Sequence, residues 1–158
     1  MKTFSKGFLA AACVAAALGM SGAAWSQDAE TAVKNRQDAM KAQGKDLGAV
    51  KAFVEGKGEL AAAQQGGADL AKRIAVVPTL FPKDTGMDKL PGKSWAKPVV
   101  WSEPDKFAAA AKTAAEKANA LDAALKTSDK DKIKAAFGDM GKNGCGGCHE
   151  TFREKKPS

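Results

Sequence analysis

The chain has 158 residues, a length that allows one domain, and its 25 Lys and Arg against 18 Asp and Glu give a formal net charge of +7. No pattern of interleaved aromatic and basic residues accompanies this charge, so nucleic acid is excluded as a partner. The composition leans to Ala, Lys, Asp, Glu and Leu and has no Tyr, which predicts an all-α protein.

The first 26 residues have the pattern of an export signal. Two lysines precede an apolar run over residues 8–20, and small residues then lead to Ala24-Trp25-Ser26, a cleavage site with Gln27 as the first mature residue. The run is too short to span a membrane, and no later run is long enough. We therefore expect residues 1–26 to be removed and residues 27–158 to form a soluble periplasmic domain without stable membrane insertion.

Export would remove two lysines and no acidic residue, so the mature chain of 132 residues keeps a formal charge of +5. A basic surface favours encounter with acidic redox partner proteins. The same charge also fits an ordinary solvated face that keeps a protein soluble, and the sequence shows no basic patch that would separate the two possibilities.

Two helical segments are predicted in the first half of the mature chain. One spans about residues 28–55 and ends at Gly56-Lys57-Gly58, and the other spans about residues 59–77 and is stopped by Pro78. Apolar or small residues recur along both at helical spacing. They are Val33, Met40, Leu47, Val50 and Val54 in the first, and Leu60, Ala63, Gly67, Leu70, Ile74 and Val77 in the second.

Residues 78–101 form a linker with four prolines. More than twenty residues without a periodic pattern is long for a connection in a compact domain, so we expect the linker to pack over the bundle as a crossover.

Two further helices are predicted after the linker, each opened by a capping box. Ser102 with Asp105 begins the third helix, and Ser128 with Asp131 begins the fourth. The expected buried positions are Phe107, Ala111, Ala114, Ala118, Leu121 and Leu125 in the third, and Ile133, Phe137, Met140 and Gly144 in the fourth. Four helices of roughly 20 residues, each about 30 Å long, predict an antiparallel four-helix bundle with a cofactor near one end.

The fourth predicted helix carries Cys145-Gly146-Gly147-Cys148-His149, the C-x-x-C-H pattern of covalent haem attachment. On a helix, Cys145 and Cys148 share a face, so both sulfurs can reach the two vinyl groups of one porphyrin. His149 lies on the same side and can be an axial ligand of the iron. We therefore predict one covalently bound haem c as the cofactor.

Three competing roles for the motif are less well supported. A redox-active C-x-x-C normally lies in a βαβ context, whereas the flanking sequence here is helical. A zinc site normally has four protein ligands, and the mature chain offers only two cysteines and one histidine. A local disulfide would leave the adjacent histidine without a role.

The position of the motif near the C-terminus, together with the helix pattern, resembles the class II cytochromes c, which comprise cytochrome c prime and its low-spin relatives. The resemblance implies a four-helix bundle and covers essentially the whole mature chain. It rests on Arg36-Gln37-x-x-Met40, Leu80-Phe81-Pro82, Lys97-Pro98-Val99-Val100-Trp101, Ala136-Phe137-Gly138 and Cys145-Gly146-Gly147-Cys148-His149-Glu150-Thr151-Phe152-Arg153. The family includes homodimers that pair through the first two helices, and the sequence leaves monomer and homodimer open.

The resemblance also implies roles for individual residues. The two motif cysteines would form thioether bonds, and His149 would be the fifth iron ligand. Arg36 and Gln37 would contact the haem propionates, although Arg36 also fits an ordinary solvated charge. Arg153, four residues after His149, would lie beside it on the same helix face, although a cation near a helix C-terminus also simply suits the helix dipole.

The sixth iron ligand separates two functions. In this family the residue at the position of Met40 faces the distal side of the haem. We expect Met40 to ligate the iron together with His149, which makes the protein a low-spin electron carrier in electron transport. If Met40 is instead an ordinary core residue, the iron is five-coordinate and binds nitric oxide or carbon monoxide. Met87, in the linker, is a weaker candidate for the sixth ligand.

Neither function is enzymatic. The mature chain has no second histidine, so a peroxidase-like mechanism would lack a distal general base. We expect no catalytic residue.

Overall fold

The computed structural model describes residues 21–155, with side chains described from Asp28 onward. Most of the predicted export signal, residues 1–26, lies outside the described residues, and its removal stays a prediction. None of the described helices combines the length and the apolar character needed to cross a membrane.

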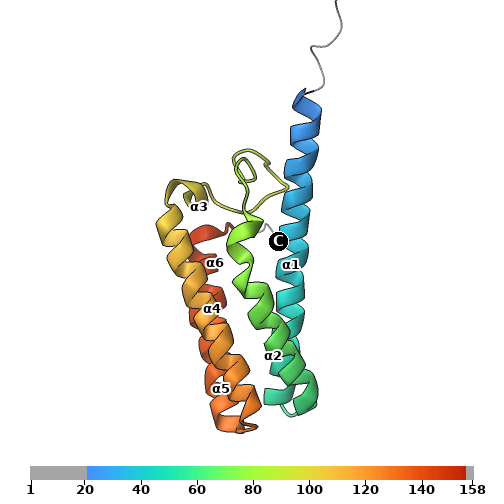
Figure 1. The fold of residues 1–158 in the computed structure, drawn as a ribbon, viewed down its shortest axis with the longest axis vertical. Helices are drawn as coiled ribbons and strands as arrows, with labels where there is room; N and C mark the ends of the chain where they lie inside the picture. The colour runs from blue at the N-terminus through green and yellow to red at the C-terminus, as the bar shows by residue number, and fades with distance from the viewer. Residues whose placement is uncertain (1–20, 156–158) are drawn as a thin grey trace, which may run out of the picture.

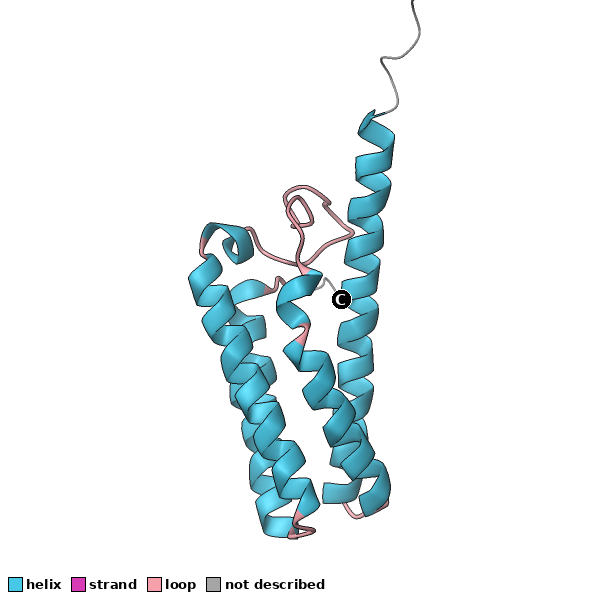
Figure 2. Cartoon of the chain, viewed as in Figure 1, coloured by secondary structure: helices cyan, strands magenta, loops and turns pink. Residues whose placement is uncertain are grey.

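Four long helical segments lie side by side along the molecule (Figure 1), and the described part of the chain consists of helices and loops (Figure 2). α2 packs against both α1 and α4, and α4 packs against the C-terminal segment. The segments are α1 (Ser21–Val54), α2 (Leu60–Ala75), α4 (Pro104–Lys126) and a C-terminal segment made of α5 (Lys130–Asp139), η2 (Met140–Gly146) and α6 (Gly147–Phe152). The predicted four-helix bundle is confirmed.

A large apolar cluster runs through the bundle from the α4–α5 turn. Leu121, Leu125 and Ile133 are fully buried there, together with Leu70 and Met140. The positions predicted to be buried in the third helix are all buried: Phe107, Ala111, Ala114, Ala118, Leu121 and Leu125. Each fully buried Leu or Ile contributes roughly 1.5–3 kcal/mol from its removal from water. This cluster is therefore the main source of the stability of the bundle.

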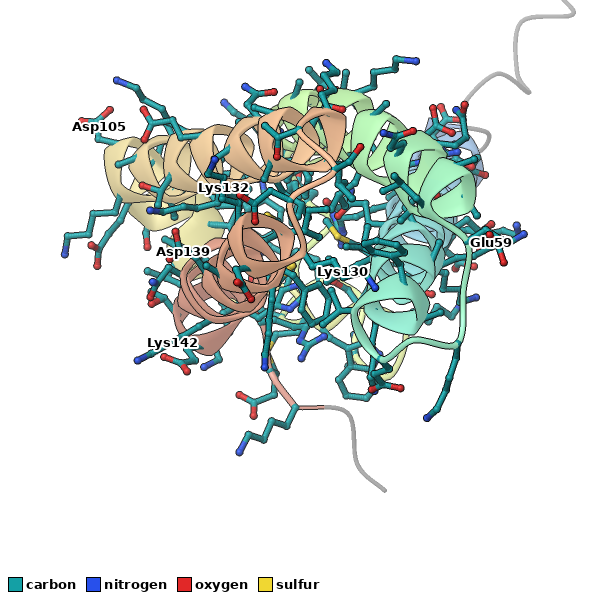
Figure 3. The ribbon with its side chains drawn as sticks, turned by 90° about the horizontal axis from the view of Figure 1, so that it is seen from below. Glu59, Asp105, Lys130, Lys132, Asp139 and Lys142 are labelled. Atoms are coloured by element: carbon teal, nitrogen blue, oxygen red, sulfur yellow. The ribbon has the colours of Figure 1, made fainter. Side chains whose placement is uncertain are left out.

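Charged side chains surround this core. Figure 3 looks along the bundle from the α4–α5 turn, and the labelled Glu59, Asp105 and Lys142 lie at the outer edge of the view. The side chain of Lys132 is exposed as well. Lys130 instead reaches toward α1, where its Nζ lies 6.0 Å from the centroid of the Phe53 ring. The apolar stripe of each helix faces inward, as amphipathic patterning requires.

Two adjacent glycines let α2 lie close to both of its neighbours. A Cβ atom on Gly66 would lie 2.6 Å from the carbonyl oxygen of Asp46 in α1, and one on Gly67 would lie 2.2 Å from Cδ1 of Leu125 in α4. Both distances are shorter than van der Waals contact. α2 therefore fits between α1 and α4 because these two positions carry no side chain.

The long linker between α2 and α4 packs over the other end of the bundle, as its length predicted (Figure 1). It begins with a 3-10 turn, η1 (Val77–Leu80), and ends with a short helix, α3 (Val99–Ser102). A second apolar cluster lies beneath it. The buried members of this cluster are Val77, Ala96, Val100, Phe107 and Phe152.

The last described residues, 153–155, form a C-terminal strap against the linker. The backbone N–H of Lys97 donates to the carbonyl of Phe152 at 2.9 Å, and the N–H of Glu154 donates to the carbonyl of Trp95 at 2.8 Å. These bonds flank an isolated antiparallel bridge between the two segments. The chain just after the C-x-x-C-H motif is thus tied to the linker by backbone hydrogen bonds.

Both predicted capping boxes are wrong. Ser102 lies inside α3, and α4 follows Glu103 with no side-chain cap. The cap of α5 is Asp129, whose Oδ1 accepts hydrogen bonds from the backbone N–H groups two and three residues on, at 3.1 and 3.2 Å. Ser128 precedes it with a φ of 59°, in the left-handed region, whereas a cap residue is extended. The sequence pattern alone does not show which residue takes the extended conformation.

Candidate functional site

A cavity of about 770 Å³ opens at the linker end of the bundle. Its volume lies in the usual range of ligand and cofactor pockets, roughly 300–1,000 Å³. The wall is built from α1, α2, α4, η2 and α6, with contributions from the linker and the C-terminal strap. Except for Met87, the weaker candidate for the sixth ligand, the residues that the sequence predicted for the site line this one cavity: Arg36, Gln37, Met40, Cys145, Cys148, His149 and Arg153. The fold therefore brings α1 and the C-terminal segment together at one place.

The C-x-x-C-H motif begins on a π-helical turn. Cys145 lies in η2, and Cys148 and His149 lie in the short helix α6. The sequence predicted an uninterrupted helix here and gave no sign of this wider turn. π-helical turns are rare and often lie at functional sites. Both cysteines and the histidine still line the same cavity.

The two cysteines contact different apolar clusters. Cys145 packs against the large cluster, and Cys148 packs against the cluster beneath the linker. Both thiols are free and partly buried. Burial raises the pKa of each thiol, and the neighbouring Cys145 adds to the rise at Cys148. Both therefore remain protonated at neutral pH and are held at one cavity wall, as thioether bonds to a single porphyrin would require.

Burial lowers the pKa of His149, and the positive charge of Arg153 lowers it further. The imidazole is therefore neutral at neutral pH and keeps a nitrogen lone pair for a metal. A neutral imidazole beside two thiols on a largely apolar cavity is the donor set that a covalently attached haem needs. The residues present fit this cofactor.

A closed zinc site does not fit the same residues. Such a site needs about four protein ligands. Within residues 21–155, no group of three or more His, Cys, Asp or Glu side chains is placed to hold a metal ion. The motif therefore lacks the further ligands that zinc would require.

Arg36 is buried and holds the linker in place. Its Nη1 donates to Oγ1 of Thr85 at 3.0 Å and to the carbonyl of Leu80 at 3.3 Å. Its Nη2 donates to the carbonyl of Thr85 at 2.9 Å and to Oγ of Ser94 at 3.0 Å. The guanidinium carbon also lies 4.5 Å from the centroid of the Phe81 ring. Burial lowers the pKa of Arg36 to about 10, so it is protonated at neutral pH.

These contacts revise the sequence interpretation of Arg36. The residue is 5% exposed, so its interpretation as a solvated charge is wrong. A guanidinium has five N–H donors; both terminal nitrogens donate to the linker, which leaves the Nε donor for a propionate. The propionate contact stays a prediction. Sequence reasoning missed the linker anchor because its partners lie 44 to 58 residues away, beyond any local pattern.

Gln37 and Arg153 lie at the wall of the cavity. Nε2 of Gln37 donates to the carbonyl of Lys93 at 2.7 Å, so this amide also holds the linker. Arg153 directly follows α6, and its backbone N–H donates to the carbonyl of His149 at 3.1 Å. Arg153 is extended (φ −121°, ψ 134°) and lies outside α6, so the expectation that it shares a helix face with His149 is wrong. The contacts of both residues with a haem stay predictions.

Met40 lines the same cavity as His149. Its side chain is partly buried and packs against the cluster beneath the linker. The other two methionines of the described chain, Met87 and Met140, are not part of the cavity wall. Met140 is fully buried and packs against Gly144. Met40 is therefore the described methionine that can reach a cofactor here, and its ligation stays a prediction.

The comparison with known proteins covers both the bundle and the site. A family model described as "Cytochrome C'" matches residues 31–153, which include the predicted site residues from Arg36 to Arg153. This chain belongs to the cytochrome c' family. Membership makes the chain a c-type cytochrome, and the cavity that the C-x-x-C-H motif lines fits the haem c of this family.

Individual relatives of this cytochrome c' match over different lengths. Cytochrome c' of Rubrivivax gelatinosus is 40% identical over 129 residues, covering 78% of this chain and 95% of the relative. A nitric oxide complex of a cytochrome c prime variant from Alcaligenes xylosoxidans has a TM-score of 0.71 at 29% identity, covering 81% of this chain and 97% of that one. Cytochrome c-554 of Cereibacter sphaeroides is 40% identical over 78 residues, covering 49% of this chain and 56% of the relative.

Proposed function

We propose that this cytochrome c' holds one haem c through Cys145, Cys148 and His149 and binds an uncharged diatomic ligand, nitric oxide or carbon monoxide. The observation that carries the proposal is that both thiols and the imidazole line one largely apolar cavity. When bound, the haem supplies an iron atom with a coordination position that such a gas can fill. The relative solved with nitric oxide favours this function over the electron carrier that the sequence first suggested.

The C-terminal segment holds the attachment residues in a fixed arrangement. Cys145 and Cys148 are anchored in different apolar clusters. The strap after α6 is bonded to the linker by the backbone of Glu154 and Phe152. His149 is kept neutral by burial and by Arg153, so its nitrogen is available as a ligand at neutral pH.

The apolar part of the cavity wall suits an apolar ligand. Met40, Phe81 and Phe107 all line the cavity. The terminal nitrogens of Arg36 donate to the linker and not into the cavity. Apolar walls exclude water and disfavour charged ligands, because a charge loses its hydration there. Uncharged diatomic molecules carry no such cost.

The proposed role is binding and not catalysis. His149 is the single histidine of the chain and is assigned to the proximal side, so no second imidazole is available as a distal general base. A peroxidase-like cycle would need such a base to move a proton.

Electron transfer is the second candidate function, and the position of Met40 favours it. The thioether of Met40 shares the cavity with His149, and thioether ligation suits electron transfer. The partial match to a cytochrome c-554 also supports this candidate. The exposed cations at the cavity, Lys41, Arg153 and Lys155, would then face an acidic redox partner.

Optical spectroscopy of the purified haem protein separates the two candidates. Gas binding predicts a high-spin ferrous spectrum that shifts on addition of carbon monoxide, with the same behaviour in Met40→Leu. A near-infrared thioether charge-transfer band in the ferric protein that disappears in Met40→Leu would overturn gas binding in favour of the carrier. Met87→Leu is the matched control, because Met87 lies outside the cavity wall.

Export to the periplasm belongs to the same proposal. It rests on the signal pattern of residues 1–26 and on the two thiols of the C-x-x-C-H motif. The intact mass of the protein from a periplasmic fraction tests it. The expected mass is that of residues 27–158 plus one covalent haem, and a mass with residues 1–26 retained would contradict export with cleavage. The same sample in a sedimentation experiment distinguishes monomer from homodimer.

A further inference from the structure

A second cavity of about 540 Å³ lies beneath the linker, beside the first. Its wall includes Phe81, Val100, Trp101 and Phe107. Two of these residues, Phe81 and Phe107, also line the first cavity. The two cavities are therefore neighbours that share an aromatic wall.

The second cavity has an apolar floor and a charged mouth. Val100 and Phe107 are buried, at 3% and 7% exposed, and Trp101 is partly buried. The charged lining residues are exposed and balance each other as two lysines and two aspartates. They are Lys83, Asp84, Asp88 and Lys89, of which Lys89 and Asp88 form an ion pair at 3.8 Å. A mouth without net charge gives no advantage to an anion or a cation, whereas the floor suits a small apolar molecule.

The backbone of Phe81 is held by hydrogen bonds, and its ring packs against neighbouring side chains. Nε1 of Trp101 donates to the carbonyl of Phe81 at 3.1 Å, and Nη1 of Arg36 donates to the carbonyl of Leu80 at 3.3 Å. The ring meets the Phe107 ring edge-on, with centroids 4.8 Å apart, and lies 4.5 Å from the guanidinium carbon of Arg36. The backbone is thus held on both sides, so rotation of the Phe81 side chain is the motion that can join the two cavities.

We propose that the second cavity is a docking site for the diatomic ligand of this cytochrome c', and that Phe81 is the partition through which the ligand passes to the first cavity. This inference rests on the proposed function and adds to it a site and a route. In this proposal the linker covers the bundle and also forms most of the wall of the second cavity, from which the gas reaches the first cavity.

The first test compares rates of carbon monoxide association with the ferrous haem protein by stopped flow. Phe81→Leu removes the aromatic partition while keeping an apolar side chain, and it should speed association by about tenfold relative to the wild type. Phe53→Leu is the matched control, since Phe53 is also partly buried and lines neither cavity. Its association rate should equal that of the wild type.

The second test does not depend on haem chemistry. Crystals of the haem protein pressurised with xenon should show xenon bound in the second cavity, next to Val100 and Trp101, because apolar cavities take up xenon. Val100→Phe places a ring in the cavity and should remove the xenon and slow carbon monoxide association. If this variant does not fold, the Phe81→Leu rates and the xenon position in the wild type decide.

Xenon in the second cavity together with faster association in Phe81→Leu supports the proposal. Either a second cavity without xenon or equal rates in Phe81→Leu and Phe53→Leu overturns it. Failure of the proposed function has a different signature, because the wild-type ferrous protein would then show no spectral change with carbon monoxide at all.

Discussion

Near the α4–α5 turn, Leu121, Leu125 and Ile133 are fully buried in one continuous apolar cluster, whereas at the linker end Phe107 and Phe152 stand beside a cavity of about 770 Å³. The buried residues at the first end are mostly aliphatic side chains of regular helices. The second is built from aromatic side chains, a π-helical turn and a long linker. The comparison indicates that one end of the bundle mainly provides stability and the other mainly provides the binding site. Substitutions at the first end should therefore lower the free energy of unfolding, and substitutions at the second should change ligand binding.

The largest effect is expected at the linker end, from removal of both attachment thiols. The double variant Cys145→Ala, Cys148→Ala should carry no covalently bound haem, because residues 27–158 contain no other cysteine. The mass of the denatured protein measures this directly. A haem adduct that persists in the double variant would show that the attachment has been assigned to the wrong residues.

The next effect is expected at the aliphatic end. Leu121→Ala should lower the free energy of unfolding by about 2–5 kcal/mol, because a fully buried side chain is replaced by a cavity. Denaturant unfolding measures the loss, and the ferrous spectrum should remain that of the wild type. Leu90→Ala, at a partly exposed position in the linker, is the control and should cost less. A changed ferrous spectrum in Leu121→Ala would show that packing at the aliphatic end also controls the haem site.

A smaller loss is expected where α2 approaches α4. Gly67→Ala should cost about 1–3 kcal/mol, because its Cβ would overlap Cδ1 of Leu125 and force the two helices apart. Gly48→Ala on α1 is the matched control, since nothing lies within 4 Å of a Cβ there. It should stabilise the protein by about 0.5–1 kcal/mol through higher helix propensity. Equal effects of the two substitutions would refute the close approach.

The smallest effect is expected from the anchor of the linker. Thr85→Val keeps the shape of the side chain but removes the hydroxyl that accepts from Arg36, at a cost of about 1 kcal/mol. The linker should then open more often, and trypsin should cleave faster after Lys89. Thr113→Val is the control, because Thr113 is exposed and its Oγ1 bonds only to a carbonyl one turn back on α4. Cleavage at the wild-type rate in Thr85→Val would mean that Arg36 does not hold the linker closed.

The sequence predicted those features that depend on periodicity or on a fixed motif. Spacing alone identified the buried positions of α4 from Phe107 to Leu125. The C-x-x-C-H motif predicted the attachment residues, and the structure brings them to one cavity. The resemblance to class II cytochromes c placed Met40 near His149, and the structure has both on one cavity.

Features that depend on backbone conformation or on distant partners could not be predicted. The residue types of a capping box do not predict the φ angle of Ser128. That angle is in the left-handed region, so Asp129 and not Ser128 caps α5. The anchoring of the linker by Arg36 requires Thr85 and Ser94 to be folded back onto α1. The second cavity arises only when Phe81 and Phe107 meet. None of these three features produces a periodic pattern or a fixed motif in the sequence.

The π-helical segment η2, seven residues from Met140 to Gly146, has a consequence for how the chain tolerates change in length. Each residue of an α-helix turns the chain by about 100°. Loss of one residue, such as Gly141, would let the segment relax into regular α-helix. Because a π-helical turn holds one more residue than an α-helical turn, Cys145 and the residues after it would keep nearly the same orientation relative to Ile133 and the apolar core. Loss of a second residue would turn α6 by about 100° and carry Cys148 and His149 away from the cavity. The π-helical segment therefore tolerates the loss of one residue but not of two.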